Sequence, residues 1–100
     1  MSVEIVRIVA ETFQEDAPIL IAQLKAGVKS GNRENVQRAA HSLKGLVANF
    51  EATSARDAAS NLELAAKNDQ LADSGGLVAE LEEQINRVMS ALGEFLEASE

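Results

Sequence analysis

The stretch RAAHSLKGLVANFEA, residues 38–52, has the spacing of an amphipathic helix and carries the only histidine of the chain, His41. Counted at 100° per residue from His41, six apolar residues fall on the opposite side: Val36, Ala39, Leu43, Leu46, Val47 and Phe50. The helix is therefore predicted to bury this face and to turn His41 towards solvent. Gly45 follows one turn later, where a glycine costs about 1 kcal/mol relative to alanine. That position needs a reason other than helix formation.

The remaining sequence continues the helical pattern, because good helix formers are abundant and no strand pattern appears. Helices are expected at about residues 3–29, 33–50, 53–67 and 74–97. Gly31 fits a C-terminal cap and Asn32 the N-cap of the next helix. Pro18 either kinks the first helix or splits it near Asp16. The predicted fold is an all-α antiparallel four-helix bundle, with residues 1–100 as a single domain.

Apolar residues repeat at helical spacing along the first and last of these helices, and both stripes are predicted to face the core. The first stripe comprises Ile5, Ile8, Val9, Thr12, Phe13, Ile19 or Leu20, Leu24 and Val28. The last comprises Leu77, Val78, Leu81, Ile85, Val88, Met89, Leu92 and Leu96.

Composition excludes several classes of function. The net charge of −7 disfavours binding to nucleic acids and to anionic membrane surfaces, because both would repel an acidic chain. No apolar run could span a bilayer and no signal peptide is visible, so a cytoplasmic location is expected. A chain without cysteine and with one histidine lacks the ligands for a zinc site, so neither a metal nor a cofactor is predicted.

The residues around His41 leave two interpretations open, an ordinary surface histidine and a reactive one. Its side of the helix also holds Glu34, Gln37, Arg38, Lys44, Gly45 and Ala48. Lys44 at i+3 favours the neutral imidazole, which is the nucleophilic form. Gly45 at i+4 and Ala48 at i+7 leave the surface ahead of the ring nearly bare. Nucleophilic hydrolysis is disfavoured because Ser42 lies about 100° away from the ring on the helix.

The segment AHSLKGLVANFEA resembles the signature of histidine-containing phosphotransfer (HPt) domains of bacterial phosphorelays. That family's pattern is A-H-x-L-K-G, four variable residues, a hydrophobic residue, then G-A. The matching residues are Ala40, His41, Leu43, Lys44, Gly45, Phe50 and Ala52. The family's next helix continues with Leu-Glu and Ala-Lys pairs, here Leu62-Glu63 and Ala66-Lys67. Glu51 stands where the family has glycine, which implies a strained cap or a different turn there.

The resemblance implies a role for each matching residue. His41 would accept a phosphoryl group on the ring nitrogen farther from the backbone, and Lys44 would lie beside the phosphate. Gly45 would keep the approach open. Glu63 would accept a hydrogen bond from the other ring nitrogen and so hold the tautomer in which the reactive nitrogen keeps a free lone pair.

The resemblance also implies a phosphocarrier rather than an enzyme, one that takes the group from a receiver-domain aspartate and passes it to another receiver. The partners would be response-regulator receiver domains, which supply the aspartate, Mg²⁺ and the other catalytic groups. A hybrid sensor histidine kinase is a further candidate. Gln37, Arg38 and Ala48 are candidates for contact with the partner. Two alternatives remain, the phospho-accepting domain of a chemotaxis-type kinase and a helical adaptor with an inert histidine.

Overall fold

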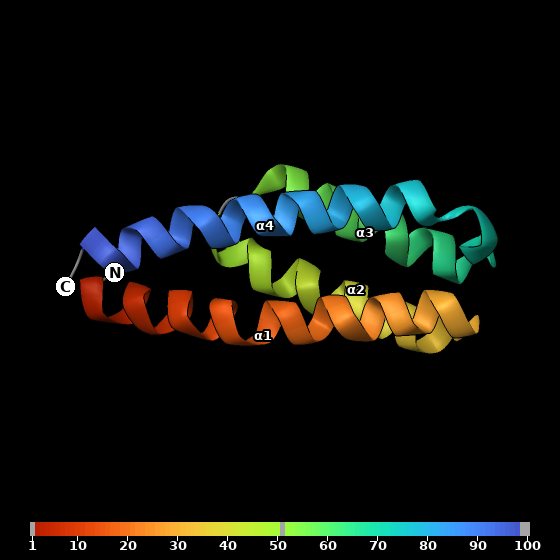
Figure 1. Ribbon diagram of the computed structural model, residues 1–100, viewed down its shortest axis with the longest axis horizontal. Helices are drawn as coiled ribbons and strands as arrows, with labels where there is room; N and C mark the ends of the chain where they lie inside the picture. The colour runs from red at the N-terminus through yellow and green to blue at the C-terminus, as the bar shows by residue number, and fades with distance from the viewer. Residues whose placement is uncertain (1, 51, 99–100) are drawn as a thin grey trace.

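The computed structural model describes residues 2–50 and 52–98, which form helices and no strands (Figure 1). The α-helices are α1 (Val3–Ser30), α2 (Arg33–Val47), α3 (Thr53–Lys67) and α4 (Gly75–Ala98). The 3-10 turns are η1 (Ala48–Phe50), after α2, and η2 (Leu71–Asp73), before α4. Consecutive helices run in opposite directions, which confirms the predicted all-α four-helix bundle.

The turn between α1 and α2 is built from the predicted caps. Gly31 has φ +72° and ends α1 in the left-handed conformation, which glycine adopts without the strain that a side chain would add. Asn32 then caps α2, because its side-chain oxygen accepts a hydrogen bond of 3.1 Å from the backbone N–H of Asn35. Two residues therefore reverse the chain and bring α2 back alongside α1.

The structure decides one helix boundary that the sequence left open and moves another. Helix α1 continues through Pro18, which excludes the alternative of a split near Asp16. Pro18 is exposed, and its ring therefore does not disturb the packing of α1 on the core. The α-helical part of α2 ends at Val47, and only a 3-10 turn continues to Phe50. Glu51 lies outside the described residues, so the strained cap expected there stays a prediction.

The predicted core faces of α2 and α4 are confirmed. The largest fully buried side chains are Phe13, Leu24, Leu43, Leu62, Leu81, Ile85, Val36, Val47 and Ser74. Leu46 of α2 and Phe50 are half-buried against this core. The rings of Phe13 and Phe50 pack edge to face with centroids 5.5 Å apart, a favoured geometry for an aromatic pair. This contact places the end of η1 against the middle of α1.

The predicted core face of α1 is wrong in part. Ile5 and Ile8 are 51% and 57% exposed, and Thr12 is exposed as well. Of the alternatives Ile19 and Leu20, Leu20 is half-buried against the core and Ile19 is 57% exposed. The buried residues of α1 are Ala10, Phe13, Ala17, Leu24 and Gly27. At Gly27 the core side of α1 has no room for a side chain, because α1 lies so close to α2 that a Cβ there would come within 2.8 Å of Val36 Cγ2.

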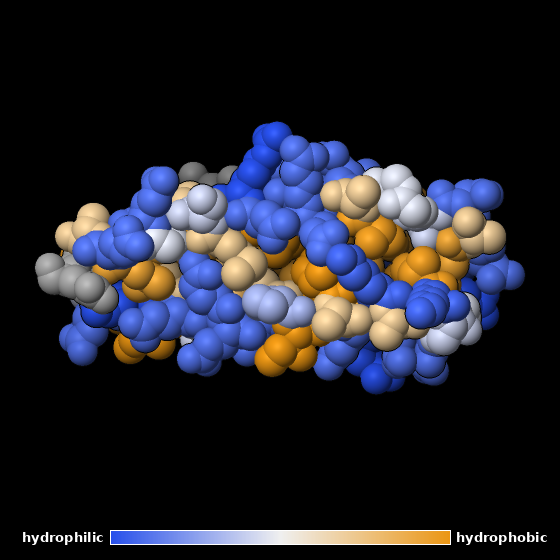
Figure 2. Space-filling view, in the orientation of Figure 1, coloured by the Kyte–Doolittle hydropathy of each residue, from blue (hydrophilic) through white to orange (hydrophobic). Residues whose placement is uncertain are grey.

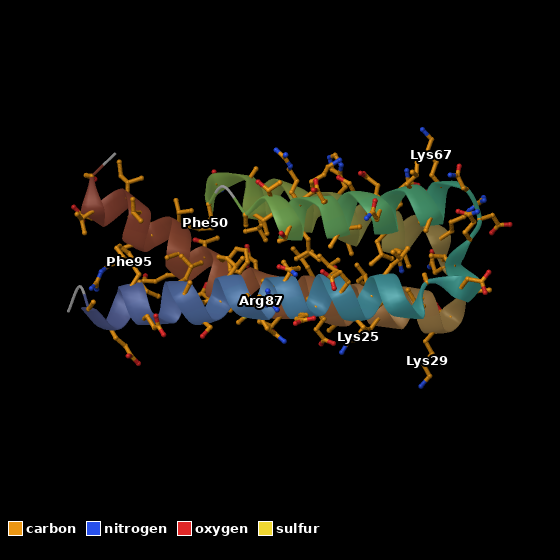
Figure 3. All side chains as sticks on the ribbon, turned by 90° about the horizontal axis from the view of Figure 1, so that it is seen from above. Lys25, Lys29, Phe50, Lys67, Arg87 and Phe95 are labelled. Atoms are coloured by element: carbon orange, nitrogen blue, oxygen red, sulfur yellow. The ribbon has the colours of Figure 1, made fainter. Side chains whose placement is uncertain are left out.

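At the end of the bundle where both chain termini lie, α1 and α4 extend beyond α2 and α3 (Figures 1 and 3). Residues 3–12 of α1 and 88–98 of α4 are called the two-helix arm below. Phe95 lies on the arm, whereas Phe50 lies where α3 begins (Figure 3). At the base of the arm the Gln14 side-chain amide donates a 2.7 Å hydrogen bond to the carbonyl of Met89. The arm accounts for the elongated shape, 44 × 20 × 18 Å.

Candidate functional site

His41 lies on the outer side of α2, as the helical pattern predicted. Its side chain is 70% exposed, whereas Ala39, Ala40 and Leu43 beside it on the helix are buried. Packing of these three residues fixes α2 against its neighbours and so fixes where the His41 ring projects. The ring is therefore carried on a rigid element but reaches solvent.

Glu63 of α3 connects the two candidate residues of α2. Its carboxylate oxygen Oε2 lies 2.8 Å from His41 Nδ1, and Oε1 accepts a 2.8 Å hydrogen bond from Lys44 Nζ. The side chains of Lys44 and Glu63 are 32% and 21% exposed, so this cluster lies at the edge of the core. The sequence singled out all three residues, but it did not indicate that one carboxylate contacts both others.

The Glu63 carboxyl is held in its ionised form. The hydrogen bond from Lys44 is the largest influence on the pKa of Glu63; it outweighs the opposing effect of burial, and the hydrogen bond with His41 lowers the pKa further. An ionised carboxylate can only accept hydrogen bonds, so the neutral His41 ring must carry its proton on Nδ1. The other ring nitrogen, Nε2, then has a free lone pair on the exposed side.

Gly45 leaves open space one turn beyond His41. A Cβ added at this position would meet no atom within 4 Å, so packing within the fold does not require glycine there. Arg38 and Ala48 are exposed and Gln37 is half-buried. Their contact with a partner stays a prediction. The structure thus shows open space at Gly45, one turn beyond the ring.

A shallow groove between α1 and α2 runs beside the His41 side of α2, and the sequence analysis missed it. The groove has a volume of about 370 Å³ and is lined by Asp16, Ile19, Leu20, Ser42 and Leu46. The spacing of Ile19 was a usable signal, since at 100° per residue it lies about 120° from Phe13 around α1. An apolar residue that far from the buried face is a candidate for contact outside the core.

Neither a metal nor a membrane is indicated by the described residues. No three His, Cys, Asp or Glu side chains of residues 2–50 and 52–98 come together as ligands for a metal ion. Within the same ranges, no helix combines the length and the apolar character needed to cross a bilayer.

Comparison with protein families identifies the chain. The family model described as Hpt domain matches residues 9–91, a range that includes α2, α3 and most of α1 and α4. The chain belongs to the Hpt domain family. Comparison with the curated proteins and with the solved structures found no match. The match of the family model confirms the resemblance noted in the sequence. Hpt domains act as phosphocarriers in histidine phosphotransfer and interact with receiver domains.

Proposed function

We propose that the chain is a phosphorelay intermediate in which Nε2 of His41 accepts a phosphoryl group from a receiver-domain aspartate and passes it to another receiver. One observation carries the proposal. The 2.8 Å contact between His41 Nδ1 and the ionised Glu63 carboxylate leaves Nε2 unprotonated, and the side chain is 70% exposed. The nucleophilic nitrogen is thus available to a partner without any rearrangement.

The transfer forms one bond and breaks one bond. The Nε2 lone pair attacks the phosphorus of the aspartyl phosphate, and the P–O bond to the aspartate breaks. Its electron pair returns to the aspartate carboxylate. The ring keeps its proton on Nδ1 and becomes positively charged, and Glu63 faces that charge directly. The same steps in reverse deliver the group to a second aspartate: its carboxylate oxygen attacks the phosphorus, the P–N bond breaks, and the electron pair returns to Nε2.

Two neighbours assist without taking part in bond formation. Lys44 Nζ lies on the same carboxylate as the ring, and its flexible side chain can turn to the phosphoryl oxygens once these arrive. The open surface at Gly45 admits the receiver to in-line geometry. Mg²⁺ and the remaining charge neutralisation are assigned to the receiver, because phosphoryl transfer needs both. The protein is therefore proposed as a carrier rather than an enzyme.

The test is transfer of label from a panel of ³²P-phosphorylated receiver domains to the wild-type chain and to His41→Gln. Glutamine has no nucleophilic nitrogen and is a good helix former, so the variant should keep its circular dichroism spectrum. We expect label on the wild type alone, labile to acid and stable to alkali, as for phosphohistidine.

Three other outcomes would contradict the proposal. Label on both proteins would move the acceptor away from His41. Label on the wild type that resists acid would exclude a phosphohistidine. Label from an ATP-bound histidine kinase, with none from any receiver, would instead favour the phospho-accepting domain of a kinase.

A further inference from the structure

We propose that Arg38 binds the phosphoryl group carried by His41, from the side of the ring opposite to Lys44. This inference rests on the proposed function and adds a second cation to the site. Arg38 stabilises the phosphorylated chain itself, whether or not a receiver is bound. The sequence singled Arg38 out only for contact with a partner, so the inference assigns it a different role.

The orientation of the His41 ring determines the side of α2 on which the phosphoryl group lies. Nδ1 is 2.8 Å from Oε2 of Glu63, so the edge of the ring that contains Nδ1 faces α3. In an imidazole, Nε2 belongs to the other edge, together with Cδ2. A phosphoryl group on Nε2 therefore lies away from Glu63, towards the side of α2 that borders α1.

Arg38 lies on that side of α2. At 100° per residue, Arg38 and Ser42 lie about 60° and 100° from His41 in one direction around the helix. Ser42 lines the groove between α1 and α2, so this direction leads to α1. Lys44 lies about 60° from His41 in the other direction, where it reaches Glu63 of α3. The two cations therefore flank the ring on opposite sides.

Arg38 is also close to His41 along the axis of α2. Residues three positions apart on a helix have Cβ atoms about 5–6 Å apart. The Cα–Cβ bond of His41 tilts towards the N-terminus of α2, where Arg38 lies. The long arginine side chain can therefore reach a group on Nε2 without any change in the helix.

Arg38 is free to bind an anion, whereas Lys44 is engaged. Arg38 is exposed and forms no ion pair with another described residue, Glu34 one turn before it included. The Lys44 ammonium already lies 2.8 Å from Glu63. A guanidinium can donate two parallel hydrogen bonds to phosphate oxygens. Arg38 can thus neutralise the incoming charge while the pair of Lys44 and Glu63 stays intact.

The charges of the chain are divided unequally between its helices, in a way that favours an anion at α2. Helix α4 carries five glutamates and one arginine, whereas α2 carries three cations and a single acid. Helices α1 and α4 form the layer of the bundle whose surface Figure 2 shows, and α2 lies in the layer behind it (Figure 1). The surroundings of His41 are therefore more positive than the net charge of −7 suggests.

The experiment measures the equilibrium constant for transfer between the phosphorylated receiver and the chain, both as free proteins. This constant compares the phosphorylated and unphosphorylated forms of each protein, so the strength of docking cancels. A residue that only contacts the receiver leaves the constant unchanged. A residue that binds the phosphoryl group on His41 changes it. The ³¹P NMR shift of the isolated phosphorylated chain gives a second readout without any receiver.

The variants are Arg38→Gln, Arg38→Lys and the matched control Arg33→Gln. Arg33 is also an exposed arginine of α2, but it lies eight positions before His41, about 12 Å along the helix, where salt screens its charge. We expect the constant for forming phosphorylated His41 to fall about threefold to tenfold in Arg38→Gln. Arg38→Lys, which keeps the charge but loses the paired donors, should fall less. Arg33→Gln should stay within about twofold of the wild type, and only changes at Arg38 should move the ³¹P shift.

Two results would overturn the inference. An unchanged equilibrium constant in Arg38→Gln, with a higher receiver concentration for half-maximal transfer, would make Arg38 a contact of the receiver only. An equal fall in Arg38→Gln and Arg33→Gln would assign the effect to the overall charge of α2. Circular dichroism checks that all variants keep the helical fold. Failure of the proposed function is distinguishable from both results, because the wild type itself would then receive no label from a receiver.

Discussion

Replacing Glu63 by alanine is expected to change which nitrogen of His41 carries the proton. A hydrogen bond to a charged group contributes about 1.5–3 kcal/mol. The His41 side chain is 70% exposed, so water competes for the bond and the lower limit applies. Since 1.4 kcal/mol is a factor of ten in an equilibrium constant, the ratio of the Nδ1–H to the Nε2–H tautomer should fall about tenfold in Glu63→Ala.

Glu63→Gln is the matched control that separates the hydrogen bond from the charge. Its amide oxygen can still accept from Nδ1, but a neutral acceptor binds the N–H more weakly than a carboxylate, so the tautomer ratio should lie between those of the wild type and Glu63→Ala. The charge opposite the phosphorylated ring is lost, however. Maximal transfer rates should therefore fall in the order wild type, Glu63→Gln, Glu63→Ala.

The tautomer is measured by ¹⁵N NMR of the imidazole, at a pH high enough for the ring to be neutral. The single histidine of the chain makes the assignment unambiguous. A wild-type spectrum dominated by the Nε2–H form would refute the argument, because His41 would then lack the free lone pair that transfer requires. Equal tautomer ratios in wild type and Glu63→Ala would refute the assigned role of the carboxylate.

Three further outcomes follow from the same contacts. Gly45→Ala should raise the free energy of unfolding by up to about 1 kcal/mol, because alanine favours the helix and its Cβ meets no atom within 4 Å. The same variant should slow phosphoryl transfer. Urea denaturation checks the stability and a labelling assay checks the rate; a loss of stability would contradict the prediction. Gly27→Ala should lower the urea midpoint, because its Cβ would come within 2.8 Å of Val36 Cγ2. Overpacking destabilises a fold by about 1–3 kcal/mol, which exceeds the gain in helix propensity. A higher midpoint would show that α1 and α2 can separate without penalty. The lowered pKa of Glu63, whose ordinary value is 4.5, stabilises the fold above that value and loses its effect as the pH falls through the folded-state pKa. Urea midpoints between about pH 5 and pH 2 should therefore decline less steeply for Glu63→Gln than for the wild type, and parallel curves would contradict this.

The sequence was sufficient for the fold because its helical signals agree with one another. The apolar face of residues 33–50 and the caps at Gly31 and Asn32 all indicate helices joined by short turns, and the structure has them. The sequence left Pro18 undecided because a proline signals either a kink or a helix boundary, and only packing decides which. The core face of α1 was wrong in part because alanine and glycine carry weak hydropathy, although close helix contact favours them.

The candidate site was predictable residue by residue but not as an arrangement. A motif names His41, Lys44 and Glu63, yet contact between α2 and α3 depends on how the two helices cross. The ion pair between Lys44 and Glu63 joins residues 19 positions apart in the chain, and no periodicity encodes such a contact. The exposure of Ile5 and Ile8 likewise depends on where η1 ends against α1, which only the packing of Phe13 on Phe50 reveals.

The two-helix arm implies that the free energy of local opening differs along the length of the molecule. In the arm, α1 buries only Ala10 and α4 only Leu92 among their described residues, whereas the four-helix part contains nearly all the large buried side chains. Segments with few buried contacts open locally at lower free energy than global unfolding requires. Amide hydrogens of the arm should therefore exchange with deuterium well before those of α2, and the helix that carries His41 should be among the last to exchange.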